Sequence, residues 1–261
     1  EGQKFGLKPP KGVLFVGVYG CGKSLSVKAL SHLWNLPLVQ FEMGKLRSSG
    51  VGDTEANVYK CLQIIESAAP CILWMDEAEK GLAGAASSGT SDAGTTSRAL
   101  GILSTWVQET NAPVCIVMTA NSLKGIPTEM VNRMTERFFV DTPDNKDRIE
   151  ILKIHLTAAK QNLDNFNFAT LAEASQELVG REIEQAIESA MTESFHAGKP
   201  ALDMDILTEE LKRKPRIIKT MGDEIREIID WVGYDEAVDD GIRARLASDR
   251  KTNRLKVVSA E

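Results

Sequence analysis

The chain has 261 residues, of which 43% are hydrophobic and 26% are charged, and its formal net charge is −6. This balance is typical of a globular protein with a well-buried core, in one large domain or in one large and one small domain. The negative net charge excludes a surface that is basic overall, as a general nucleic-acid binder would have. The absence of an apolar run of about 18 residues excludes a membrane-spanning helix.

Short apolar segments alternate with longer amphipathic ones in the first half of the chain. The apolar segments are 13–18, 37–43, 71–76, 114–121 and 137–143. They are rich in Val, Ile and Phe, as strands buried on both faces of a parallel sheet are. Helical patterns cover 23–34, 54–67 and 94–110. The alternation predicts an α/β fold, a parallel sheet with helices on both faces. Small and polar residues at 81–97 predict a mobile loop leading into a helix.

The pattern becomes entirely helical after Pro143. We expect helices over 146–160, 180–197, 204–212 and 216–232. The predicted domains are an α/β domain at 1–144, a small helical lid at 145–214, and a C-terminal helix with a basic tail at 215–261. The basic residues of 243–256 could contact an acidic partner or nucleic acid, but we favour a solvated, partly disordered tail.

Residues 17–24, GVYGCGKS, match the phosphate-loop pattern G-x-x-x-x-G-K-[ST] between a predicted strand and a predicted helix. Glycines let backbone N–H groups approach phosphates closely, and the helix N-terminus adds a positive dipole. Lys23 would supply a charge to the β and γ phosphates, and Ser24 a hydroxyl to Mg²⁺. A simple strand–helix turn is the alternative, which the strand and helix on either side disfavour.

Polar side chains end two further strands. Asp76 and Glu77 follow the strand at 71–76, at the end where ligands bind in open α/β sheets. Asp76 could hold Mg²⁺, and Glu77 could orient and deprotonate an attacking water. Asn121 ends the strand at 114–121 and could hydrogen-bond either the γ phosphate or that water, although such an Asn is often only a turn residue.

Three arginines are candidates for charge stabilisation. Arg133 and Arg137 lie near the last strand, where a guanidinium could reach the γ phosphate bound by a neighbouring subunit. A surface salt bridge is the alternative. Arg181 begins a predicted helix of the lid and could contact the nucleotide or simply be solvated.

Together, GVYGCGKS, CILWMDE, MTAN, NRMTERFFVDTPD and LVGREIEQAIESAM resemble the AAA family of ATPases over about residues 1–212. GLKPPKGVLFVG, APCILWMDE and FFVDTPD are most similar to cyanobacterial and plastid-encoded AAA proteins. The resemblance implies ATP and Mg²⁺ as cofactors. It implies catalytic roles for Glu77, Asn121 and Arg133, and metal binding by Ser24 and Asp76. The implied nucleotide-binding residues are Gly6, Leu7, Gly17, Gly20, Cys21, Gly22, Lys23, Ser24, Leu25 and Arg181.

The resemblance also implies a homo-oligomer, a hexameric ring or helical stack, that remodels a protein partner. Two departures favour an alternative, a nucleotide-regulated scaffold with weak or no turnover. Met130 replaces the first of two arginines that AAA proteins commonly carry three apart, and Gly50 stands where unfoldases have a pore aromatic residue. A small-molecule kinase is a third alternative, against which the adjacent Asp76 and Glu77 and the helical lid argue.

The four cysteines, Cys21, Cys61, Cys71 and Cys115, have spacings that match no metal-binding pattern. Cys71 and Cys115 lie in apolar runs and are predicted to be buried. Because residues 1–12 also lack the apolar stretch of a signal peptide, we expect a reducing, cytoplasmic location such as the bacterial cytosol, a phage-infected cell or the plastid stroma. A redox switch at Cys21 is the less favoured alternative.

Overall fold

The computed structural model describes residues 12–42, 53–82, 91–222, 225, 228 and 255–257, with the backbone alone at 53, 91–96 and 255–257. The described residues divide into two compact units. The first contains 12–17, 23–139 and 255–257, and the second contains 18–22 and 140–228. The five residues 18–22 of the phosphate loop therefore group with the helical part of the chain. None of the helices in the described ranges is long and apolar enough to cross a membrane.

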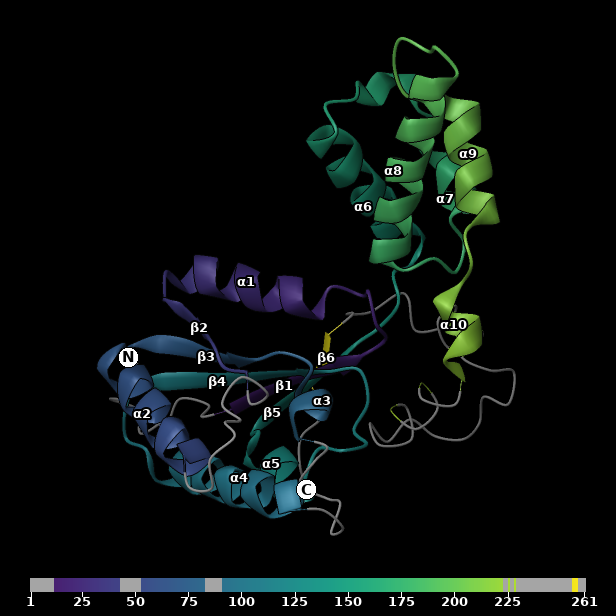
Figure 1. Cartoon of the computed structure of the whole chain (residues 1–261). Helices are drawn as coiled ribbons and strands as arrows, with labels where there is room; N and C mark the ends of the chain where they lie inside the picture. Colours follow the sequence, from purple (N-terminus) through teal and green to yellow (C-terminus); the bar gives the residue numbers. More distant parts are fainter. Residues whose placement is uncertain are drawn as a thin grey trace. The chain divides into compact units, whose positions relative to one another are not determined.

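The first unit is built on a sheet of strand order β2-β3-β4-β1-β5-β6 (Figure 1). The strands are β1 (Gly12–Gly17), β2 (Leu38–Gln40), β3 (Cys71–Met75), β4 (Val114–Ala120), β5 (Glu136–Val140) and β6 (Leu255–Val257). The pairs β1–β4, β2–β3 and β3–β4 are parallel. Every residue of β1 and β3 is buried, which explains their continuous apolar sequences. The predicted parallel α/β sheet is confirmed, whereas β6 was not predicted.

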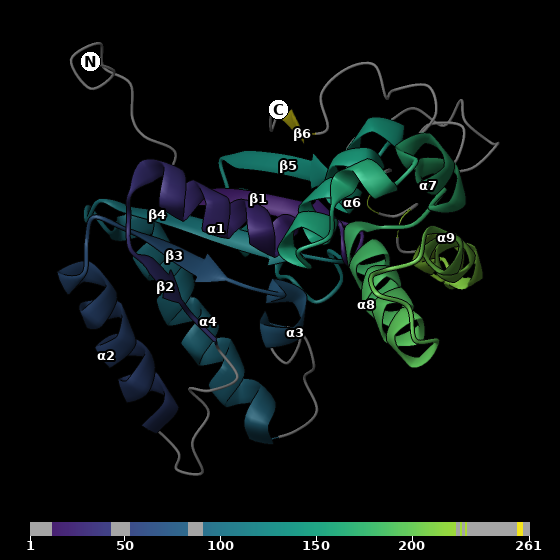
Figure 2. The ribbon, with the colours of Figure 1, turned by 90° about the horizontal axis from the view of Figure 1, so that it is seen from above.

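Helices cover both faces of this sheet. They are α1 (Lys23–Trp34), α2 (Asp53–Ser67), α3 (Ala78–Leu82), α4 (Ser91–Glu109) and α5 (Thr128–Arg133). Helix α1 covers one face, and α2 and α4 lie side by side on the other (Figures 1 and 2). The short α3 directly follows the end of β3. The crossover connections of a parallel sheet require this arrangement, because consecutive strands must run in the same direction.

The strand register brings three strand ends to one edge of the sheet. Val16 of β1 pairs with Ala120 of β4, so Gly17 and Asn121 are the next residues on these two neighbouring strands. Met75 of β3 pairs with Met118 of β4, which places Asp76 beside Thr119. The polar residues that follow these buried strands are thus brought together by the backbone pairing.

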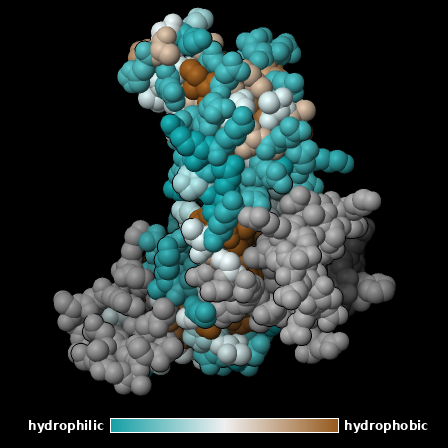
Figure 3. Space-filling view, turned by 90° about the vertical axis from the view of Figure 1, so that its right-hand side faces the viewer, coloured by the Kyte–Doolittle hydropathy of each residue, from teal (hydrophilic) through white to brown (hydrophobic). Residues whose placement is uncertain are grey.

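The second unit is a helical bundle. Its helices are α6 (Asn145–Ala158), the 3-10 helix η3 (Leu163–Asn165), α7 (Phe168–Ala174), α8 (Gly180–His196), α9 (Met204–Arg213) and α10 (Ile217–Thr220). Residues such as Leu152, Leu156, Ile183, Ile187 and Leu207 form its apolar core. The face of the bundle seen in Figure 3 is mostly hydrophilic, as expected of a surface in contact with water. The sequence did not predict η3, α7 or α3, which are too short to show helical periodicity.

Two predicted segments differ in the structure. The single helix expected over 216–232 is interrupted, because α10 ends at Thr220 and Met221 leaves the helical conformation before helix resumes at Gly222. An apolar face at helical spacing does not distinguish one helix from two short ones. The loop expected over 81–97 is also shorter than predicted, since Gly81 and Leu82 end α3 and α4 already begins at Ser91. Most of the basic tail lies outside the described residues.

Candidate functional site

Lys23 begins helix α1 directly after the phosphate loop, and its side chain is buried, with 6% of the residue exposed. Its ammonium donates to the carbonyl oxygen of Gly17 at 2.9 Å and to Oδ1 of Asn121 at 2.7 Å. A buried charge must be compensated by such contacts. Lys23 therefore places a positive charge between the ends of β1 and β4.

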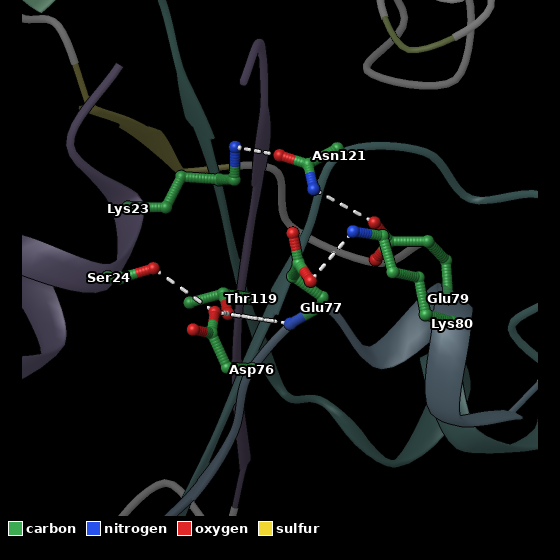
Figure 4. Close-up of polar contacts among 8 residues, drawn as sticks. All are labelled: Lys23, Ser24, Asp76, Glu77, Glu79, Lys80, Thr119 and Asn121. Atoms are coloured by element: carbon green, nitrogen blue, oxygen red, sulfur yellow. Dashed lines mark hydrogen bonds and ion pairs between the residues drawn. The ribbon is translucent and has the colours of Figure 1, made fainter. Parts of the chain in front are cut away.

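Asp76 is the centre of a hydrogen-bond cluster at the end of β3 (Figure 4). Its Oδ1 accepts from the hydroxyl of Ser24 at 3.1 Å, from the hydroxyl of Thr119 at 2.5 Å and from the backbone N–H of Glu77 at 3.1 Å. These three donors come from α1, from β4 and from the chain after β3. The carboxylate is consequently held in one orientation, with its oxygen next to the Ser24 hydroxyl.

Glu77 adopts a left-handed backbone conformation, with φ of 47°. Such a conformation is unfavourable for a residue other than glycine and is common at functional sites. The N–H of Glu77 also lies 3.3 Å from the Thr119 hydroxyl, which helps to hold this turn. Its carboxylate accepts from the ammonium of Lys80 on α3 at 2.8 Å, and this pair is exposed enough to exchange readily with water.

Asn121 connects the Lys23 side of the site to helix α3. Its Oδ1 accepts from Lys23, and its Nδ2 donates to Oε1 of Glu79 at 2.9 Å. Figure 4 shows Lys23, Asn121 and Glu79 joined in this order. The structure thus brings Lys23, Ser24, Asp76, Glu77 and Asn121 together at one sheet edge.

The phosphate-loop glycines adopt conformations that other residues rarely take, with φ of 83° at Gly20 and 94° at Gly22. Within the second unit, Gly20 also lies against the start of α8. A Cβ atom added to Gly20 would be 2.9 Å from Val179 and 3.1 Å from the Cβ of Arg181. The backbone N–H of Arg181 donates to the Gly20 carbonyl at 3.3 Å, and the guanidinium lies over the Tyr19 ring at 5.3 Å. Arg181 is therefore attached to the loop.

The segment after α9 packs on the same loop. Val18, Val179, Ile218 and Ile225 form a small buried cluster, against which Cys21 also packs. The carboxylate of Glu182 accepts from the N–H of Val179 at 2.8 Å and from the N–H of Ile217 at 2.7 Å. One side chain of α8 thus caps its own helix and holds the beginning of α10. The redox switch at Cys21 remains the less favoured alternative.

The structure places the two arginines of the 133–137 segment differently. Arg137 donates from Nε to the carbonyl of Met134 and from Nη2 to the carbonyl of Val131, so it stabilises the end of α5. Arg133 ends α5, and its Nε is buried without a hydrogen-bond partner among the described residues. Met130 is fully buried, which accounts for an apolar residue at the position where an arginine was expected.

Some predicted residues lie outside the described part of the chain, and some residues of the candidate site were not predicted. Gly6, Leu7 and Gly50 lie outside the described residues. Leu25 is 69% exposed on α1. Thr119, Glu79 and Lys80 at the sheet edge were missed, and so was Tyr19, which contacts Arg181 in the second unit. The MTAN and DEAEK segments contained Thr119 and Glu79, but only the strand register shows that these side chains face Asp76 and Asn121. Cys71 is buried as predicted, whereas Cys115 is only partly buried, because it lies on a strand position that the helices do not fully cover. Desolvation raises the pKa of both thiols.

The residues present fit Mg²⁺ and a nucleotide phosphate chain. In the described ranges, no three His, Cys, Asp or Glu side chains converge as a complete metal site. The Ser24 hydroxyl and Asp76 carboxylate form instead the partial oxygen set that suits Mg²⁺, which commonly takes its other ligands from phosphates and water. The buried ammonium of Lys23 suits an anion. Mg²⁺ bound here would neutralise charge on the phosphates, while Ser24, Asp76 and Lys23 would hold the metal and the anion.

A parallel sheet with a glycine-containing loop after β1, a buried lysine at the start of α1 and an acidic end to β3 defines an α/β P-loop domain. The model of the family described as "ATPase family associated with various cellular activities (AAA)" matches residues 13–142. The chain belongs to the AAA ATPase family, and nucleotide binding is the property that this membership implies.

The chain is similar to several curated proteins. It is 38% identical over 232 residues to the "Uncharacterized AAA domain-containing protein ycf46" of Guillardia theta, covering 88% of this chain and 45% of that relative. The protein of the same name from Pyropia yezoensis is 37% identical over 251 residues, covering 95% and 49%. The "Cell division cycle protein 48 homolog" of Archaeoglobus fulgidus is 28% identical over 212 residues, covering 79% and 28%. This chain spans about half the length of the two ycf46 relatives.

Proposed function

We propose that this protein hydrolyses Mg²⁺-ATP at the interfaces of a homo-oligomer, a hexameric ring or helical stack, and uses the energy to remodel a protein partner. The observation that supports hydrolysis most directly is the Asp76 cluster. Ser24 and Asp76 would hold Mg²⁺, and Glu77 follows at once in a strained turn. Lys23 would bind the phosphates, and Glu77 would orient and deprotonate the attacking water.

The test of hydrolysis is the Glu77→Gln variant. The amide cannot take a proton from water, so phosphate release should fall by about 100-fold or more while ATP stays bound. We would measure phosphate release at saturating Mg²⁺-ATP and, separately, the Kd for ATP. Glu150→Gln, which removes an exposed ion pair with Lys153 on α6, is the matched control and should hydrolyse ATP at the wild-type rate.

The second candidate is a nucleotide-regulated scaffold with weak or no turnover. Buried Met130 favours it, because a second interface arginine is absent at that position. Wild-type protein that binds ATP but releases no phosphate at any protein concentration would contradict the ATPase proposal and support the scaffold. If hydrolysis is found, the partner is best sought among proteins that co-purify with the Glu77→Gln variant, which should remain in the ATP-bound state.

A further inference from the structure

The side-chain amide of Asn121 has only one orientation that satisfies both of its neighbours. Its oxygen is 2.7 Å from the ammonium of Lys23, and its nitrogen is 2.9 Å from Oε1 of Glu79. A lysine ammonium only donates hydrogen bonds, and an ionised carboxylate only accepts them. A reversed amide would place a donor against a donor and an acceptor against an acceptor. The orientation therefore follows from the chemistry of the neighbours.

One oxygen of the Glu79 carboxylate is buried, although the residue as a whole is only partly buried. It lies on α3, two residues after Glu77, and its Oε2 is buried without a hydrogen-bond partner in the part of the chain that the structure describes. A buried polar atom with no partner is unfavourable for folding. The bond from Asn121 satisfies the other oxygen, Oε1, and fixes the carboxylate relative to β4. A carboxylate with an unpaired buried oxygen, two residues after the candidate base Glu77, indicates a role in the site.

We propose that Glu79 is a positioning residue that holds the Asn121 amide with its oxygen toward the phosphate side of the site, so that Asn121 accepts a hydrogen bond from the attacking water. The proposal rests on the proposed ATP hydrolysis. It also decides between the two roles that the sequence left open for Asn121, because a phosphate oxygen accepts hydrogen bonds and cannot bond an amide oxygen.

The two halves of the Asn121 amide have different partners when a nucleotide is bound. If Lys23 serves the phosphates, the Asn121 oxygen loses its present donor and needs another, and water can supply one. The Asn121 nitrogen keeps its bond to Glu79, because that bond does not involve Lys23 or the phosphates. Glu77 follows β3 at the same sheet edge to which the strand register brings Asn121, so a water bound by Asn121 would be on the side of the sheet where Glu77 lies.

The first test compares Glu79→Ala with Glu79→Gln. Alanine removes the acceptor, so kcat should fall about tenfold or more while KM for ATP changes less than about twofold. Glutamine still offers an amide oxygen to Asn121 and should restore most of kcat. A fall in the affinity for ATP with kcat unchanged, or equal loss in both variants, would overturn the proposal. Thermal unfolding of each variant shows whether it is folded.

The second test exchanges donor and acceptor between the two positions. Asn121→Asp alone places two carboxylates together and should nearly abolish turnover. In Glu79→Gln/Asn121→Asp, the glutamine nitrogen can donate to one aspartate oxygen, and the other oxygen can accept from water. We expect the double variant to hydrolyse ATP about tenfold faster than Asn121→Asp. If Asn121 instead donates to the γ phosphate, aspartate cannot replace it in either background, and no recovery should occur.

Failure of the proposed ATP hydrolysis and failure of the proposed role of Glu79 give different results. Wild-type protein without ATP turnover would overturn the proposed function, and the role of Asn121 with it. Wild-type turnover without recovery in the double variant would overturn the positioning role of Glu79 alone. Recovery in the double variant, with the kcat loss of Glu79→Ala, supports both.

Discussion

The hydroxyl of Thr119 connects the two acidic residues of the site. It donates to Asp76 Oδ1 and lies within hydrogen-bond distance of the Glu77 N–H, and the residue itself is 1% exposed. A buried hydroxyl with these contacts holds Asp76, the candidate Mg²⁺ ligand, at a fixed distance from the backbone of Glu77, the candidate base. Asp76 and Glu77 alone, as neighbours in sequence, would not be held in this way.

Thr119→Val tests this role, because valine has nearly the same shape without the hydroxyl. Removal leaves the Glu77 N–H and Asp76 with one partner fewer, so the free energy of unfolding should fall by about 1–3 kcal/mol. Urea denaturation measures this change, and we also expect slower phosphate release. The control is Thr192→Val on α8, where the hydroxyl is exposed and bonds only its own helix. Equal stability of the two variants would contradict the role.

Helix α9 begins at a capped and charged junction. Asp203 accepts from the N–H groups of Asp205 and Ile206 and pairs with Lys199 at 2.9 Å. The hydrogen bond from Lys199, together with the backbone N–H of Ile206, lowers the pKa of Asp203, and the same contact raises the pKa of Lys199. The connection between α8 and α9 is therefore stabilised by ionisation.

The sign of the pH dependence follows from these shifts. Because the pKa of folded Asp203 is lowered, its contribution to stability is present above about pH 3.9 and is lost as the pH falls through the folded pKa. Asp203→Asn keeps the cap oxygen but removes the charge. Its Tm should be lower than that of the wild type at neutral pH, and the difference should shrink below about pH 3.9. Glu209→Gln, from an exposed pair on α9, should change Tm little. A Tm difference that persists in acid would contradict this assignment.

At the scale of the whole molecule, Arg133 stands apart from the residues of the candidate nucleotide site described above. The Nε of Arg133 is buried without a partner among the described residues, whereas Arg137 is engaged with α5. An arginine supplied by a neighbouring subunit can stabilise the charge that develops in phosphoryl transfer. Arg133 is thus the candidate for the residue that acts between subunits.

The prediction is that hydrolysis depends on assembly. Specific activity of the wild type should rise with protein concentration, and Arg133→Ala should lower kcat by about 1,000-fold without loss of ATP binding. Arg137→Ala should instead lower Tm, because the α5 carbonyls lose their donors. Phosphate release across a dilution series, with sedimentation to follow assembly, measures both effects. An Arg133→Ala variant with unchanged activity would exclude it as the interface arginine.

The local sequence determined the parallel α/β fold and pointed to most residues of the candidate site, because buried strands, glycine turns and a loop lysine are each recognisable within a few consecutive residues. GVYGCGKS and CILWMDE are such local patterns. Tertiary structure alone decided that Thr119 meets Asp76 and that Glu79 meets Asn121, since these pairs are 43 and 42 residues apart and depend on strand register. It also decided that the apolar 216–232 segment is interrupted and packs in part on Val18. Periodicity shows that a face is apolar but not what covers it.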